Sequence, residues 1–127
     1  MEKVRILVIE DDEDNLELVR FLLDQEGYEV LLARDGRRGL ELAEAEHPNL
    51  VLLDMSIPEI DGWKLAGMLK DSPKTRGIGI IALTGHTAPG DRKRAIDAGC
   101  DGYISKPLDI PAFAGVVSEY LEKIKPE

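Results

Sequence analysis

The chain has 127 residues, of which 43% are hydrophobic and 32% are charged, and its formal net charge is −9. These values are typical of one globular domain with a substantial core, here residues 1–127, and they exclude a disordered chain. The acidic balance argues against contact with nucleic acid phosphates, which need a basic face, and no apolar run approaches the length that spans a membrane.

The single cysteine, Cys100, excludes an internal disulfide and suits a reducing compartment. The first apolar segment, residues 4–9, is too short for a signal peptide and runs directly into acidic residues 10–14. We therefore expect a cytoplasmic protein. One basic cluster, residues 92–94, is interpreted as a solvated helix face.

Strand and helix signals alternate along the chain. Residues 4–9 predict the first strand, and a helix is expected after Asp14, with Glu17 as its capping-box partner. Residues 29–33 predict the second strand, and residues 37–46 predict the second helix.

The third strand is expected over residues 50–53, an entirely apolar run. A loop over residues 54–61 follows it. The next helix places Leu65, Met68 and Leu69 on one face.

The remaining elements follow the same alternation. Residues 78–83 predict the fourth strand, about 91–98 a helix, and about 102–105 the fifth strand. Apolar residues from Phe113 to Ile124 then recur at helical spacing, which predicts the last helix.

Strands that alternate with helices predict right-handed crossovers and a parallel sheet covered on both faces. Five strands in this length fit the doubly wound α/β order 2-1-3-4-5, a flavodoxin-like fold whose switch point lies between the first and third strands. Glu10 and Asp11 follow the first of these strands, and Asp54 follows the other. The fold therefore predicts a site at these residues without any motif.

Carboxylates gathered at one sheet edge favour a cation. Two of them about 4 Å apart repel by roughly 4 kcal/mol at an effective dielectric near 20, so three in one crevice raise their pKa values or recruit a metal ion. Oxygen ligands without nearby His or Cys favour a hard ion, and few protein ligands suit Mg²⁺ better than Ca²⁺. Alternatively, residues 11–14 only decorate a helix N-terminus, which leaves Asp54 and Lys106 unexplained.

A carboxylate such as Asp54 can accept a phosphoryl group when the charge on the phosphoryl oxygens is neutralised. A metal ion supplies one neutralising contact, Lys106 a second, and the Thr84 hydroxyl a hydrogen bond. Alone, each residue has an ordinary interpretation: a strand-ending Asp, a surface Lys and a β-forming Thr. Their joint placement at neighbouring strand ends favours the functional interpretation.

With these residues in place, the chain closely resembles the receiver domain of bacterial two-component response regulators. The most specific segments are residues 54–62, Asp-Met-Ser-Ile-Pro-Glu-Ile-Asp-Gly, and residues 98–107, Ala-Gly-Cys-Asp-Gly-Tyr-Ile-Ser-Lys-Pro. The resemblance extends from the first strand through the last helix. No output domain follows, so the chain looks like the stand-alone, single-domain regulators.

The resemblance implies that Asp54 accepts a phosphoryl group from a phosphohistidine on a sensor histidine kinase or a histidine phosphotransfer protein. It implies that the domain is not an enzyme, although it assists its own Mg²⁺-dependent phosphorylation and dephosphorylation. Asp11, Asp54 and the Ser56 backbone carbonyl would bind Mg²⁺ directly, and Glu10 would act largely through water.

The resemblance also implies a conformational switch. Lys106 would pair with the phosphoryl oxygens, Thr84 would swing toward them, and Tyr103 would move inward behind Thr84. The face made by the fourth helix, fifth strand and fifth helix would then change for a downstream protein partner. Gly85 departs from the small Ala common at this position and should leave more space for Thr84.

Three alternatives remain open on the residues. A flavin-binding protein of this fold needs a phosphate loop after the first strand, where this chain is acidic. A haloacid-dehalogenase-type phosphatase expects a second Asp where Ser56 stands. A receiver that acts purely as a binding module would be favoured by loss of Asp11, Asp54 or Lys106, and all three are present.

Overall fold

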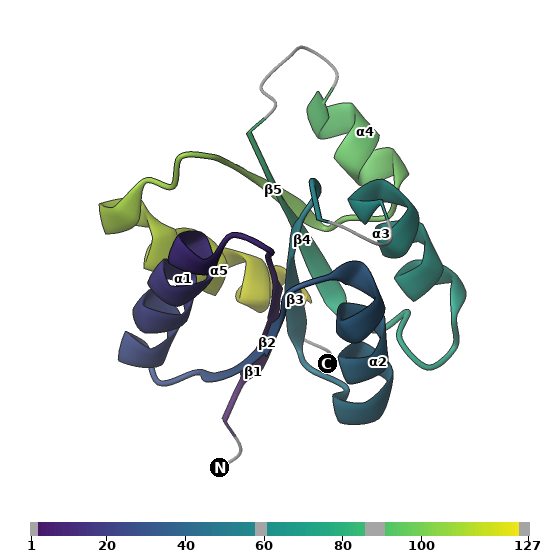
Figure 1. Ribbon diagram of the computed structural model, residues 1–127, viewed down its shortest axis with the longest axis horizontal. Coiled ribbons are helices and arrows are strands. Elements are labelled where there is room, and N and C mark those ends of the chain that lie inside the picture. The colour runs from purple at the N-terminus through teal and green to yellow at the C-terminus, as the bar shows by residue number, and fades with distance from the viewer. Residues whose placement is uncertain (1–2, 58–60, 86–90, 125–127) are drawn as a thin grey trace.

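The computed structural model describes residues 3–57, 61–85 and 91–124 (Figure 1). Within these ranges five strands alternate with five helices. In chain order they are β1 (Arg5–Ile9), α1 (Glu13–Gln25), β2 (Glu29–Ala33), α2 (Gly36–Glu46), β3 (Leu50–Asp54), α3 (Gly62–Asp71), β4 (Gly79–Thr84), α4 (Asp91–Asp97), β5 (Gly102–Ser105) and α5 (Ile110–Ile124).

All five strands pair in parallel in the order β2-β1-β3-β4-β5, which confirms the predicted doubly wound fold. The register pairs Ile9 with Leu53 and Thr84 with Ser105. The carboxyl ends of β1, β3, β4 and β5 therefore meet at one edge of the sheet.

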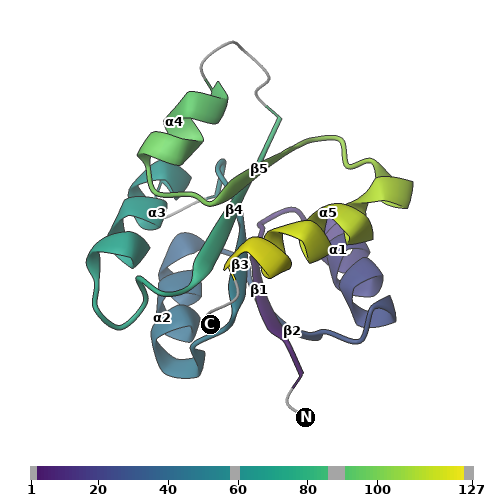
Figure 2. The same ribbon diagram turned by 180° about the vertical axis from the view of Figure 1, so that it is seen from behind.

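Two apolar cores lie on opposite faces of the sheet. Helices α1 and α5 cover one face, and α2, α3 and α4 cover the other (Figures 1 and 2). In β3, Leu50 and Leu52 pack into the core under α1 and α5, whereas Val51 and Leu53 pack into the core under α2, α3 and α4. Burial on both faces explains why the central strands are continuous apolar runs rather than alternating ones.

The first helix begins earlier than predicted. Its N-cap is Asp12, whose side chain makes no capping hydrogen bond, so the expected capping box of Asp14 and Glu17 is wrong. Acidic side chains are favoured throughout the first helical turn, so a run of them does not mark one capping position. In α2, by contrast, the Asp35 side chain accepts a hydrogen bond from the Arg38 backbone N–H, 2.8 Å away.

Two strands extend further toward the site than predicted. Asp54 and Thr84 are the last residues of β3 and β4 rather than the first residues of loops. Ile78 lies in a turn, where its N–H donates to the Thr75 carbonyl at 2.9 Å. Asp54 and Thr84 belong to their strands because the ladders extend to them, pairing Asp54 with Leu83 and Thr84 with Ser105.

No helix in the described part of the chain is long and apolar enough to cross a bilayer.

Candidate functional site

Backbone hydrogen bonds that continue the sheet fix the positions of the candidate residues. The Glu10 N–H donates to the Ala33 carbonyl at 3.0 Å, directly after β1. The Lys106 N–H donates to the Thr84 carbonyl at 2.8 Å, directly after β5. Asp54 itself is the last residue of β3. The three side chains are therefore attached to one rigid sheet edge.

Glu10 and Asp54 are 1% and 3% exposed, so both carboxyl groups are removed from water. Lys106 bridges them: its Nζ lies 3.0 Å from Glu10 Oε1 and 3.0 Å from Asp54 Oδ2. Burying a carboxylate without a partner costs several kcal/mol, and this cation offsets part of that cost. The Lys106–Pro107 peptide bond is cis, an isomer that the sequence left open.

Backbone N–H groups bind the carboxyl oxygens that Lys106 does not contact. The Asp12 N–H donates to Glu10 Oε2 at 3.2 Å, and the Ser56 N–H donates to Asp54 Oδ1 at 3.0 Å. Both carboxyl groups are thus held in one orientation by the chain itself.

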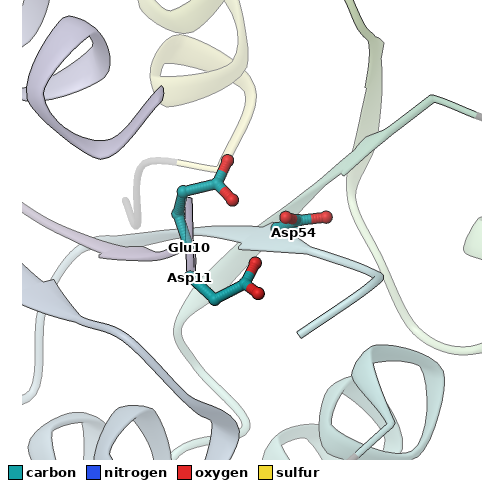
Figure 3. A group of neighbouring side chains, drawn as sticks. All are labelled: Glu10, Asp11 and Asp54. Carbon is teal, nitrogen blue, oxygen red and sulfur yellow. The ribbon is translucent and has the colours of Figure 1, made fainter. Parts of the chain in front are cut away.

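Asp11 completes an acidic group with these two residues. One carboxyl oxygen from each of Glu10, Asp11 and Asp54 lies within 4.8 Å of the others, as their gathering in Figure 3 shows. Asp11 is exposed whereas its two neighbours are buried, so the group opens to solvent on the Asp11 side.

The three charged groups at the core of the site shift each other's pKa values. Burial, together with the hydrogen bond to Asp54, raises the pKa of Glu10 to about 7. Burial also opposes ionisation of Asp54, but hydrogen bonds from Glu10, the Ser56 N–H and Lys106 outweigh it and lower the Asp54 pKa. Burial opposes the charge of Lys106 as well, yet its contacts with Asp54 and Glu10 raise the Lys106 pKa. At neutral pH Asp54 is therefore the ionised partner, and Glu10 readily holds a proton.

The donor set fits a magnesium ion. Mg²⁺ takes hard oxygen ligands at about 2.0–2.1 Å in octahedral geometry, which separates ligand oxygens by roughly 3 to 4 Å. The three carboxyl oxygens, all within 4.8 Å of one another, need only a small closure to reach that spacing. Burial, followed by the neighbouring Asp54, raises the Glu10 pKa to about 7, and a nearby dication would favour the ionised form of this buried carboxyl group.

The other predicted residues surround this cluster. Thr84 is 1% exposed at the end of β4, and a Cβ added to the exposed Gly85 would meet no atom of the described residues within 4 Å. Tyr103 is half-buried against the core under α2, α3 and α4, and its N–H donates to the Tyr120 hydroxyl at 3.4 Å. This backbone hydrogen bond ties β5 to α5. Motif residues 58–60 and the segment 86–90 lie outside the described residues.

A pocket beside the cluster was not predicted. It has a volume of about 460 Å³, and both Glu10 and Lys106 lie in its wall. Leu18 of α1 and Leu108 and Ile110 near the start of α5 supply apolar lining. The apolar residues that follow Pro107 were the available signal, but nothing in the sequence shows that α1 lies opposite them.

Comparisons with known proteins agree with this geometry. The family model of the response regulator receiver domain matches residues 6–118. The polar-differentiation response regulator DivK of Brucella ovis is 39% identical over 116 residues, which cover 91% of this chain and 94% of that protein.

Solved structures show the same likeness. A CheY-like response regulator receiver domain protein from Methanospirillum hungatei JF-1 is 30% identical with a TM-score of 0.89, and the match covers 98% of each chain. The receiver domain of a sensor histidine kinase from Pseudomonas aeruginosa PAO1, with a magnesium ion coordinated in its active-site cleft, is 27% identical with a TM-score of 0.86. That match covers 95% of this chain and 99% of the other. The chain therefore belongs to the response regulator receiver domains, the phosphorelay proteins of two-component signalling.

Proposed function

We propose that residues 1–127 form one receiver domain in which Asp54 is the phosphoacceptor, and that its phosphorylation requires Mg²⁺. The observation that carries the proposal is the contact of Lys106 with the buried Asp54, whose carboxylate lies 3.0 Å from the Lys106 Nζ. The lowered pKa of Asp54 agrees with it. The protein is a signalling domain rather than a classical enzyme, and the chemistry it assists is its own phosphorylation and dephosphorylation.

In the proposed reaction an oxygen of the ionised Asp54 attacks phosphorus. The new bond joins Asp54 to phosphorus, the bond from phosphorus to the donor's imidazole nitrogen breaks, and the imidazole leaves with the electron pair. The lowered pKa keeps Asp54 nucleophilic at neutral pH. Lys106, already in contact with Asp54, neutralises charge on the phosphoryl oxygens.

Asp11, Asp54 and the Ser56 backbone carbonyl are the proposed direct ligands of Mg²⁺, and Glu10 acts largely through water. When bound, the ion supplies positive charge to the phosphoryl oxygens. A bound dication nearby would favour the ionised form of Glu10, because a neighbouring positive charge lowers a carboxyl pKa. The magnesium in the cleft of the Pseudomonas aeruginosa receiver domain supports this assignment.

The proposed phosphodonor is a phosphohistidine on a sensor histidine kinase or a histidine phosphotransfer protein. Among the described residues, Asp11, Ser56 and Gly85 are exposed around the buried Asp54 and offer such a partner an accessible surface at the carboxyl edge of the sheet.

The proposed output begins with movement of the Thr84 hydroxyl toward the phosphoryl group, followed by inward movement of Tyr103. These residues end β4 and lie within β5. A downstream protein would read the resulting change on the face formed by α4, β5 and α5.

Labelling from a small phosphodonor such as acetyl phosphate tests the assignment. The wild type should incorporate phosphate in Mg²⁺ and lose incorporation in chelator, whereas Asp54→Asn should incorporate none. Asp12→Asn is the matched control, because Asp12 is an exposed acidic neighbour outside the acidic group. Equal labelling of Asp54→Asn and the control would reject Asp54 as acceptor, and an unlabelled wild type would favour a pure binding module.

A further inference from the structure

Helices α3 and α4 are joined by a stacked pair of side chains. The guanidinium carbon of Arg94 lies 4.3 Å from the centroid of the Trp63 ring. The two helices lie side by side in both views of the molecule (Figures 1 and 2). The basic cluster was predicted to be a solvated helix face, and Lys93 fits that prediction because its ion pair with Asp97 stays within α4. Arg94 instead reaches across to another element.

Trp63 is tightly coupled to the chain that leaves Asp54. Gly62 lies so close to this segment that a Cβ there would be 2.6 Å from Met55 Cα, a backbone atom. The Asp61 side chain accepts a hydrogen bond from the Trp63 N–H at 2.9 Å. The first turn of α3, which carries Trp63, is therefore packed directly on the residue after Asp54.

Arg94 is coupled to the other side of the site. It lies in α4, the helix that follows the β4 strand ended by Thr84, and its neighbour Ala95 is fully buried in the core. Ala95 shares that core with Ala82 of β4, so α4 packs on the strand that Thr84 ends. The stack therefore joins α3, which packs on the residue after Asp54, to α4, which packs in the same core as β4.

We propose that the Trp63–Arg94 stack is a latch that holds α4 against α3 in the unphosphorylated protein, and that its release accompanies phosphorylation. This inference rests on the proposed function, because it assigns a regulatory contact to the same site. A contact made in only one of two conformations biases the equilibrium toward that conformation. Losing an exposed cation–π contact should shift the equilibrium by about two- to fivefold.

Hydrogen exchange of the α4 amides in the unphosphorylated protein tests the latch without any phosphodonor. Arg94→Gln and Trp63→Leu should each speed exchange in α4 by about two- to fivefold, and the double variant should add little to either change. Lys93→Gln is the matched control, since Lys93 is an exposed cation of the same helix that contacts Asp97 instead. Because Arg94 is also exposed, its replacement should leave the fold intact.

The same variants should differ in labelling from acetyl phosphate in Mg²⁺. Arg94→Gln should be labelled about two- to fivefold faster than Lys93→Gln, because the released α4 is the arrangement that phosphorylation favours. Exchange in Arg94→Gln equal to that in the control would overturn the latch, and faster exchange without faster labelling would overturn its link to the site. A wild type that exchanges as expected but takes no label would instead contradict the proposed function alone.

Discussion

Lys106 is one cation placed between two buried carboxyl groups, and this imbalance decides how protons are distributed in the site. Its Nζ is 3.0 Å from both Glu10 and Asp54. Burial, followed by the neighbouring Asp54, raises the Glu10 pKa to about 7, so Glu10 is partly protonated at neutral pH. The site is thereby prepared to exchange that proton for a metal ion.

The Glu10 pKa makes stability depend on pH. A carboxyl pKa raised to about 7 means that the folded state binds the proton more tightly than the unfolded chain does. The stabilisation that comes from the Glu10 proton is therefore complete at acidic pH, and it is lost as pH rises through the Glu10 pKa of the folded state. In chelator, the free energy of unfolding should fall between about pH 5 and pH 8.

Chemical denaturation of the wild type and Glu10→Gln across this range is the measurement. The variant should show a smaller fall, because it lacks the titrating group. Asp54 does not disturb the comparison, since its lowered pKa places its own contribution at more acidic pH. Parallel pH profiles for the two proteins would count against the assignment.

Lys106→Ala should leave two buried carboxyl groups without their cation. We expect the free energy of unfolding at slightly alkaline pH to fall by about 1 to 3 kcal/mol, while the fold is retained. Lys64→Ala, which removes an exposed lysine of α3, should change the free energy of unfolding by less than about 0.5 kcal/mol.

The Lys106→Ala variant should also lose the spectral change that accompanies phosphorylation. An unaltered change would show that Lys106 is not needed for switching.

At the scale of elements, the start of α3 is fixed by the absence of a side chain at Gly62. A Cβ at this position would lie 2.6 Å from Met55 Cα, so the backbone after Asp54 would have to move. Gly62→Ala should therefore destabilise the protein by about 1 to 3 kcal/mol. Gly67 in the same helix has nothing within 4 Å of its added Cβ, so Gly67→Ala should stabilise by about 0.5 to 1 kcal/mol. Urea unfolding of both variants decides this, and equal stabilities would contradict the packing argument.

The elements themselves were largely predictable, because each strand is an apolar run buried on both faces and each helix repeats at its own period. The residues at which the helices and strands begin and end were less predictable. The sequence offered several acidic residues that could cap α1, and Asp12 rather than Asp14 holds that position. Asp54 and Thr84 belong to their strands because ladder pairing, which depends on the neighbouring strand, extends to them.

At the scale of the whole molecule, topology brought the site together. Parallel strands in the order 2-1-3-4-5 place Glu10, Asp54 and Lys106 at one edge, although Lys106 is far from Glu10 along the chain. The sequence could therefore predict which residues meet. It could not predict that the Glu10 pKa is raised while the Asp54 pKa is lowered, or that Arg94 stacks on Trp63, because both depend on side-chain packing between elements. The isomer of the bond before Pro107 was also left open by the sequence.

Family membership also decides between the alternatives that the residues left open. A match to the receiver domain model over residues 6–118 sets aside the flavin-binding and haloacid-dehalogenase-type interpretations. Whether this receiver is phosphorylated, or acts purely as a binding module, depends on the chemistry at Asp54.

Chemical mapping of the phosphorylated residue tests that chemistry most directly. The protein would be treated with acetyl phosphate in Mg²⁺ and then with borohydride, which reduces an aspartyl phosphate to homoserine, before digestion and peptide sequencing by mass spectrometry. We predict homoserine in place of Asp54, with Asp11 and Asp12 unchanged. Homoserine at another aspartate, with Asp54 intact, would contradict the account.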